Sequence, residues 1–233
     1  MSRIFIFDAV HTILRPIPDV VSAYFLAGQR HGSSLTKDEV KKEFRIARRK
    51  WFGTFVAASE TQPGSLQSSD AIERQLWRDL VSDIFSNVNP IDQLFAELWS
   101  HFANAKYWQL YDDVESCWTQ LKENGERIVI ASNFDSRLNE IVSMHPTLGL
   151  ADAVYCSAEV GYRKPDPLFY KTVSDSFGID DSDEVIMIGD DFENDYVGPV
   201  KFGWRAFHLD RRAAPTGNQN TISSLNALPM KYQ

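Results

Sequence analysis

After Tyr111 the sequence alternates between short β-rich apolar runs and longer stretches of helical character, and this alternation restricts the possible folds more than any other feature. Strands that alternate with helices are typical of a parallel sheet whose strands are joined by crossover helices. Together with an earlier apolar run, the predicted strands cover residues 3–7, 127–131, 153–156, 184–188 and 205–208. The predicted helices between them cover residues 112–124, 168–177 and about 194–203. We therefore expect an α/β fold with a doubly wound parallel sheet.

Residues 16–105 contain no comparable strand pattern and carry apolar side chains at helical spacing instead. Thr36 and Glu39 match a capping box at the start of one predicted helix. Asn89-Pro90 is predicted to supply the N-cap and the first residue of another helix. This block is therefore predicted to be all-helical.

The length of 233 residues exceeds the usual size of one domain without demanding two. A core domain that carries a smaller inserted domain fits both this length and the change of pattern along the chain. We therefore predict a core of residues 1–15 and 106–233 and a helical cap domain of residues 16–105.

The composition is that of an ordinary globular protein, with 43% hydrophobic and 24% charged residues. A formal net charge of -8 opposes binding to a phosphate backbone, so nucleic acid is not expected as a partner. Two cysteines are too few for a disulfide framework, which fits a reducing compartment. The first apolar run meets Asp8 before it forms a signal segment, and no stretch approaches the roughly 18 apolar residues of a membrane span. We expect a cytoplasmic protein with no membrane partner.

Polar residues that suit phosphate chemistry follow the predicted strands. Asp8, Ser132 and Asp190 come directly after three of them, and Lys164 lies in the loop after a fourth. In open α/β sheets, ligands bind outside the carboxyl ends of the strands. We therefore expect these four side chains to share one small pocket.

The residue types in this pocket fit magnesium-assisted phosphate handling. A carboxylate and a phosphate are both anions, so their approach needs cations, which Lys164 and Mg²⁺ would supply. Asp190 and Asp195 fit the hard oxygen ligands that Mg²⁺ prefers. The Ser132 hydroxyl and the Asn133 backbone N–H can donate to phosphoryl oxygens.

The polar residues stand in the order Asp8-Ala9-Val10-His11-Thr12, Ser132-Asn133, Lys164-Pro165-Asp166-Pro167 and Gly189-Asp190-Asp191-Phe192-Glu193-Asn194-Asp195. In order, spacing and strand context, the chain resembles the haloacid dehalogenase-like hydrolase superfamily over nearly its whole length. The resemblance implies a Rossmann-like core with a C1-type helical cap inserted after the first strand. It implies covalent catalysis by Asp8 with Lys164. It further implies phosphate contacts from Thr12, Ser132, Asn133 and Lys164, and Mg²⁺ held by Asp8, the backbone carbonyl of Val10, Asp190 and Asp195.

Val10 departs from the family pattern. Most phosphatases that the chain resembles have a second aspartate there, which protonates the leaving group and then activates water. Valine has no proton to give, and such help is typically worth about 10² to 10⁴ in rate. His11 replaces the usual glycine and is a candidate substitute, because its unperturbed pKa lies near neutrality. Successive side chains of an extended segment point apart, however, which favours a His11 side chain that faces the cap.

Several of these residues also have purely structural explanations. Ser132 fits a helix N-cap, and Asp195 fits an early helical position favoured by the helix dipole. Asp191 and Glu193 are predicted to be solvated. Pro199 falls inside the last predicted helix and is predicted to kink or break it.

The leading hypothesis is a magnesium-dependent phosphomonoester hydrolase that acts through an aspartyl-phosphate intermediate on a small phosphorylated metabolite. A hydrolase of carbon–halogen bonds also fits Val10, but attack on carbon needs no metal and leaves Asp190 and Asp195 without a purpose. The other alternative is a catalytically silent relative that binds a phosphorylated ligand or a partner protein through its cap.

Overall fold

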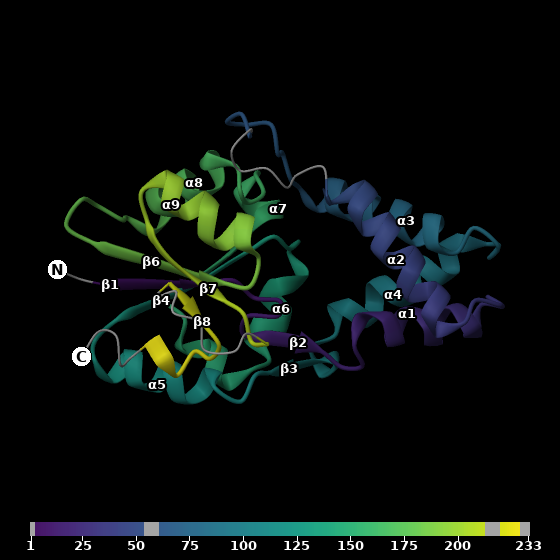
Figure 1. The fold of residues 1–233 in the computed structure, drawn as a ribbon, viewed down its shortest axis with the longest axis horizontal. Coiled ribbons are helices and arrows are strands. Elements are labelled where there is room, and N and C mark those ends of the chain that lie inside the picture. Colours follow the sequence, from purple (N-terminus) through teal and green to yellow (C-terminus); the bar gives the residue numbers. More distant parts are fainter. Residues whose placement is uncertain (1–2, 54–60, 213–219, 229–233) are drawn as a thin grey trace.

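The centre of the molecule is a six-stranded sheet with the strand order β5-β4-β1-β6-β7-β8 (Figure 1). The computed structural model describes residues 3–53, 61–212 and 220–228. Every neighbouring pair in the sheet runs parallel, which confirms the predicted parallel sheet. The strands are β1 (Arg3–Phe7), β4 (Arg127–Ser132), β5 (Ala153–Cys156), β6 (Glu184–Gly189), β7 (Arg205–Leu209) and β8 (Thr221–Ile222).

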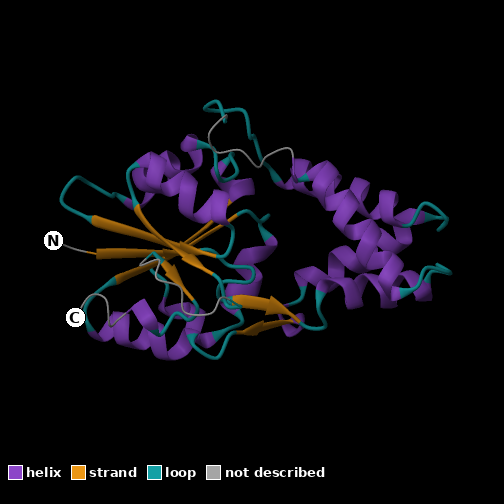
Figure 2. Ribbon diagram, in the orientation of Figure 1, coloured by secondary structure: helices purple, strands orange, loops and turns teal. Residues whose placement is uncertain are grey.

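Helices cover both faces of this sheet. They are α5 (Val114–Glu123), α6 (Arg137–Ser143), α7 (Ser157–Val160), α8 (Pro167–Phe177) and α9 (Gly198–Phe202), with the 3₁₀ helix η3 (Pro146–Leu150) and the π-helix η4 (Phe192–Val197). Figure 2 shows the strands between α8 and α9 on one side and α5 on the other. The alternation of side chains along β1 explains the two layers, because Phe5 and Phe7 join the apolar cluster under α5 while Ile4 and Ile6 join the cluster under α8.

A short antiparallel ribbon lies where the chain leaves the core after β1 and returns to it. It pairs β2 (Leu14–Pro16) with β3 (Trp108–Leu110), and its register joins Leu14 to Leu110. The sequence patterns do not predict this ribbon, because three residues are too few to show an alternation of buried and exposed positions. The ribbon brings the two ends of the helical insert together.

The insert consists of helices that surround an apolar cluster of their own. They are α1 (Val20–Arg30), α2 (Lys37–Trp51), α3 (Asp70–Ile84) and α4 (Ile91–Ala103), followed by η2 (Ala105–Tyr107). Tyr24, Leu80 and Leu94 are among the buried members of that cluster. Figure 1 shows these helices grouped at one end of the sheet, beyond the β2–β3 ribbon. Among the described residues, no helix is both long and apolar enough to cross a membrane.

Two sequence signals in the insert have different outcomes. The capping box is confirmed, because Thr36 accepts from the Glu39 N–H while Glu39 binds the Thr36 N–H. The prediction that Pro90 is the first helical residue is wrong. Its ψ of 133° is extended, so Pro90 is the N-cap and α4 begins at Ile91.

The last predicted helix is one helical stretch of two types. A π-helical stretch, η4, precedes α9, which has Pro199 in its first turn. Proline lacks an N–H and is tolerated only where that group has no helical partner. The backbone stays helical through Val197 and Gly198, so Pro199 does not break the stretch. The helix predicted from about residue 194 instead begins at Phe192 and changes from π to α just before Pro199.

Candidate active site

The sheet order places three of the predicted site residues side by side. Asp8 follows β1, Ser132 ends β4 and Asp190 follows β6, and β1 lies between the other two strands. The Asp8 N–H donates to the carbonyl of Ile188 on β6 at 2.9 Å, which extends the pairing to the edge of the site. Parallel pairing therefore brings the polar ends of three distant segments to one edge.

Lys164 connects these residues. Its Nζ donates to Asp8 Oδ1 at 2.8 Å, to Asp195 Oδ1 at 2.6 Å and to the Ala131 carbonyl at 2.9 Å. The Ser132 hydroxyl donates to the same Oδ1 of Asp8 at 2.9 Å. All three ammonium donors are thus used, and the Asp8 carboxylate is fixed in one orientation.

Asp8, Asp190 and Asp195 form an acidic cluster in which one carboxylate oxygen from each residue lies within 4.8 Å of the other two; Asp8 and Asp195 are buried and Asp190 is partly buried. Thr12 holds Asp190 in this cluster, because its hydroxyl donates to Asp190 Oδ1 at 3.3 Å and accepts from the Asp190 N–H at 3.1 Å. Thr12, which the resemblance assigns to phosphate, is therefore engaged with Asp190 in this structure. Asp195 accepts from the Asp191 N–H at 3.1 Å in addition to its contact with Lys164.

The cluster carries an excess of negative charge. Burial raises the pKa of Asp190 to about 7, with the carboxylates of Asp8 and Asp191 adding to the effect. Burial also raises the pKa of Asp195 well above its ordinary value, while Lys164 opposes the change. Burial alone would lower the pKa of Lys164, but Asp195 and Asp8 outweigh it and raise that pKa. One ammonium facing three carboxylates leaves a site that a divalent cation would neutralise.

Asn133 takes a role that the sequence does not indicate. Its side-chain Oδ1 accepts from the Lys164 N–H at 2.8 Å, and its Nδ2 donates to the Lys164 carbonyl at 2.9 Å. Its amide therefore holds the backbone of the lysine. Ser132 does not cap a helix, because α6 begins at Arg137 with Ser136 as its N-cap.

The backbone at His11 differs from the extended segment that the sequence argument assumes. His11 has a φ of 66°, in the left-handed region, and its N–H donates to the Leu14 carbonyl at 2.7 Å. Val10 forms an isolated bridge with Leu14. The alternation argument against His11 is therefore wrong, because a turn rather than a strand sets its direction.

The charges around His11 come from both parts of the chain. Partial burial lowers the pKa of His11, the Asp8 carboxylate raises it, and the cations of Arg48 and Arg212 lower it further. Arg48 belongs to α2 of the insert, so charges of both the core and the insert shift the pKa of this imidazole.

Two other residues support the site in ways that only the structure reveals. Asp191 accepts from the Glu193 and Asn194 N–H groups, so it caps η4 and its prediction as merely solvated is corrected. Arg211 donates to the Thr12 carbonyl at 2.7 Å and to Asp113, which ties the loop after β1 to the start of α5. No local sequence pattern indicates these contacts, because their partners are brought together by the fold.

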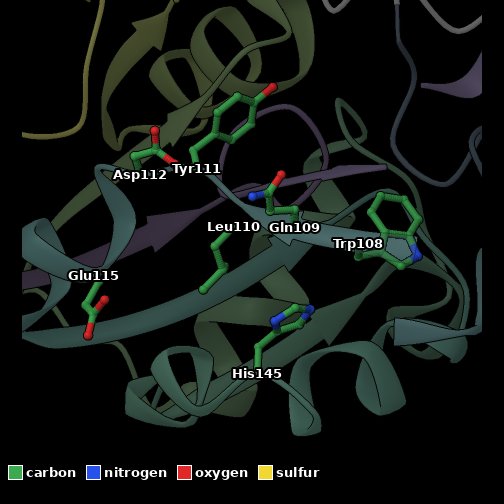
Figure 3. Close-up of a pocket in the computed structure, with 7 residues that line it drawn as sticks. All are labelled: Trp108, Gln109, Leu110, Tyr111, Asp112, Glu115 and His145. Carbon is green, nitrogen blue, oxygen red and sulfur yellow. The ribbon is translucent and has the colours of Figure 1, made fainter. Parts of the chain in front are cut away.

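A separate hollow of about 320 Å³ lies beside β3 (Figure 3). It is lined by Trp108, Gln109, Leu110, Tyr111, Asp112, Glu115 and His145. The predicted site residues are not among these lining residues. The hollow is therefore distinct from the acidic cluster.

Comparison with known proteins identifies relatives along most of the chain. The family model for haloacid dehalogenase-like hydrolase matches residues 3–203. The human haloacid dehalogenase-like hydrolase domain-containing protein 3 is 27% identical over 215 residues, which cover 88% of this chain and 80% of that protein. The protein of the same name from Danio rerio is 24% identical and covers 98% of this chain and 95% of its own length.

Solved structures share the fold. The HAD-hydrolase YfnB from Bacillus subtilis, bound to magnesium, has a TM-score of 0.75 and 16% identity, with 99% of this chain and 98% of that chain covered. The L-2-haloacid dehalogenase from Xanthobacter autotrophicus has a TM-score of 0.72 and 16% identity, with 100% of this chain and 98% of that chain covered. A HAD phosphatase from Thermococcus onnurineus has a TM-score of 0.66 and 18% identity, with 100% of this chain and 98% of that chain covered. With the match over residues 3–203, the chain belongs to the haloacid dehalogenase-like hydrolase family.

Proposed function

We propose that this protein is a magnesium-dependent phosphomonoester hydrolase that acts on a small phosphorylated molecule through an aspartyl-phosphate at Asp8. The observation that carries the proposal is the cluster of Asp8, Asp190 and Asp195, in which one oxygen from each carboxylate lies within 4.8 Å of the others and Lys164 pairs with Asp8 and Asp195. A hydrolase that attacks carbon has no use for such a cluster of metal-ligand type, whereas phosphoryl transfer needs its charge neutralised.

The donor set fits Mg²⁺, which binds one or two carboxylates together with water and substrate oxygens. Asp8 and Asp190 would be direct ligands, with the Val10 backbone carbonyl as the third that the family resemblance implies. Asp195 is already bound to Lys164 and to the Asp191 N–H, so it would support the site mainly by its charge. When bound, the cation would neutralise part of the charge that the phosphoryl group and the carboxylates bring together.

In the proposed reaction, a carboxylate oxygen of Asp8 forms a bond to phosphorus while the bond between phosphorus and the leaving oxygen breaks. The leaving group departs with that electron pair. Water then hydrolyses the aspartyl-phosphate, which releases phosphate and restores the carboxylate. The Lys164 ammonium, whose raised pKa keeps it charged at neutral pH, stabilises the developing negative charge. The Ser132 hydroxyl and the Asn133 backbone N–H are proposed donors to the phosphoryl oxygens, with Thr12 assisting through Asp190.

We propose that residues 16–105 act as a cap domain on a core of residues 1–15 and 106–233. The separate apolar cluster of the insert and its attachment through the β2–β3 ribbon support this division. Exclusion of water by a cap strengthens electrostatic stabilisation and protects a reactive intermediate.

The test is a panel of phosphate esters assayed with and without Mg²⁺, beside 2-haloacids assayed for halide release. We expect phosphate release that requires Mg²⁺ and is abolished in Asp8→Asn. Halide release that is independent of Mg²⁺ would establish the dehalogenase alternative. Retention of phosphate release by Asp8→Asn would exclude the proposed nucleophile.

A further inference from the structure

The segment of the insert that precedes α3 pairs with residues 161–166, hereafter the lysine loop. Gln67 forms an antiparallel bridge with Tyr162, and the Arg163 N–H donates to the Leu66 carbonyl at 2.8 Å. Figure 1 shows the segment before α3 extending back from the helical insert toward α7, whose end leads into this loop. The insert is therefore attached to the core at a second place, far from the β2–β3 ribbon.

A buried ion pair strengthens this attachment on one side of the catalytic lysine. Arg163 Nε donates to Glu73 Oε1 at 2.6 Å, and its Nη2 contacts Oε2 of the same carboxylate. The two side chains are only 5% and 3% exposed. The Ser68 hydroxyl donates to Glu73 at 2.6 Å, and the guanidinium lies 5.0 Å from the centre of the Phe52 ring. A two-pronged contact of this kind fixes both distance and orientation, and each charge depends on the other because both are removed from water.

A second buried carboxylate holds the other side of the lysine. Asp166 accepts from the Gly64 N–H at 2.9 Å and from the Leu66 N–H at 3.1 Å, both in the insert. The same side chain accepts from the Leu168 N–H at 3.0 Å and so caps α8. The residue before Lys164 and the second residue after it are thus each bound to the insert.

The side chain of Lys164 requires an accurately placed backbone. Its ammonium makes three contacts while the residue is only 1% exposed, so little freedom remains for a displaced loop to be corrected by a change of rotamer. A misplacement of about 1 Å in a catalytic group can cost about 10² in rate.

We propose that Glu73 and Asp166 are positioning residues that couple docking of the insert to the placement of Lys164 against Asp8. In this arrangement the insert completes the active site as well as covering it. The catalytic part of the inference rests on the proposed phosphatase function, whereas the mechanical link between insert and lysine loop does not.

The test compares Glu73→Gln with a control variant that also removes the negative charge of a carboxylate paired with an arginine. Asp92→Asn removes another carboxylate that binds an arginine of α3, Arg78, but this pair lies at the surface, with Asp92 71% exposed. Hydrogen exchange of the lysine-loop amides is measured in both variants and the natural protein. kcat and KM are measured with Mg²⁺ and an aryl phosphate.

We expect exchange in the lysine loop to accelerate at least about tenfold in Glu73→Gln, together with a fall in kcat of about 10-fold to 10²-fold. KM should stay within about twofold, because the phosphate contacts of the core remain. Asp92→Asn should leave exchange and kinetics unchanged. Should Glu73→Gln fail to fold, Asp166→Asn keeps one acceptor oxygen and carries the same expectation.

Unchanged exchange in the lysine loop of a folded variant would overturn the proposed link. Faster exchange with an unchanged kcat would overturn the positioning role. If the natural protein releases no phosphate, the proposed function fails by itself, and the exchange comparison still decides whether Glu73 holds the loop.

Discussion

Asp190 is the residue whose ionisation should govern metal binding. Burial and the neighbouring carboxylates raise its pKa to about 7 in the metal-free protein. A carboxylate must be ionised to bind a cation, so protons compete with Mg²⁺ and affinity falls as pH falls through that value. We expect the apparent Kd for Mg²⁺ to be about tenfold larger at pH 6 than at pH 8. Titration calorimetry checks this, and an affinity that is constant over the same range would contradict it.

Asp190→Asn provides the control for that titration. The amide cannot carry the negative charge, so Mg²⁺ binding and activity should weaken together. An unchanged Mg²⁺ affinity in this variant would show that Asp190 is not a ligand.

Val10 is the residue that should decide which esters are cleaved. Without a proton donor at this position, the enzyme should favour acyl and aryl phosphates over alkyl phosphates, because those leaving groups need little protonation. Val10→Asp should raise alkyl-phosphate turnover, by up to the roughly 10² to 10⁴ that general acid help typically supplies. Initial rates on matched aryl and alkyl esters measure the effect.

His11 is the residue that would supply the proton if the natural protein hydrolyses alkyl phosphates well. Robust alkyl-phosphate hydrolysis by the natural protein, lost in His11→Ala but kept in Val10→Ala, would show that the imidazole has the acid/base role. The turn at His11 makes this comparison necessary, because the side chain does not follow the direction of a strand.

The sequence predicts the residues that meet in the site better than it predicts their partners. Asp8, Ser132 and Asp190 were identifiable because each follows an apolar strand run, and the sheet brings them to one edge. The contacts of Asn133 with the Lys164 backbone depend on two loops that are 31 positions apart in the chain. No local pattern encodes such a contact.

At the scale of elements, the length of a strand determines whether its pattern of apolar residues predicts it from the sequence. The strands β1, β4, β5, β6 and β7 were predicted to within one residue at each end, because their apolar runs are long enough to recognise. The short strands β2, β3 and β8 have three, three and two residues, and they pair only because neighbouring elements hold them in place. The predicted helix start at Pro90 is one position too early, because the proline ring fixes φ but leaves ψ free to be extended, as it is at Pro90.

The end of β6 leads to a prediction about packing against the acidic cluster. A Cβ added at Gly189 would collide with the carboxylate of Asp195, whose position is fixed by Lys164. Gly189→Ala should therefore displace Asp195 and lower the free energy of unfolding by about 1–3 kcal/mol. Gly149→Ala is the matched control, since a Cβ there meets no atom within 4 Å. Urea denaturation of both variants measures the difference, and equal stabilities would contradict the close packing of Asp195.

At the scale of the whole molecule, the insert is joined to the core at several places. The β2–β3 ribbon forms one, and the pairing of residues 64–68 with the lysine loop forms a second. Arg137 of α6 also donates to the Trp99 carbonyl of α4 at 2.9 Å. The Ser136 N–H also donates to Asp70 of α3 at 2.9 Å, so the loop after β4 contacts the same helix. The loop after β4 and the lysine loop both contact α3, which links the site to the insert that covers it in the proposed mechanism.

The most direct test of the phosphatase account is to trap the proposed covalent intermediate. The protein is mixed with Mg²⁺ and acetyl phosphate, quenched in acid, digested and analysed by mass spectrometry. The account predicts one added phosphoryl group on the peptide that contains Asp8, no such group when Mg²⁺ is replaced by EDTA, and none in Asp8→Asn. Release of phosphate during turnover without any phosphoryl group on Asp8, or its appearance on another residue, would contradict the account.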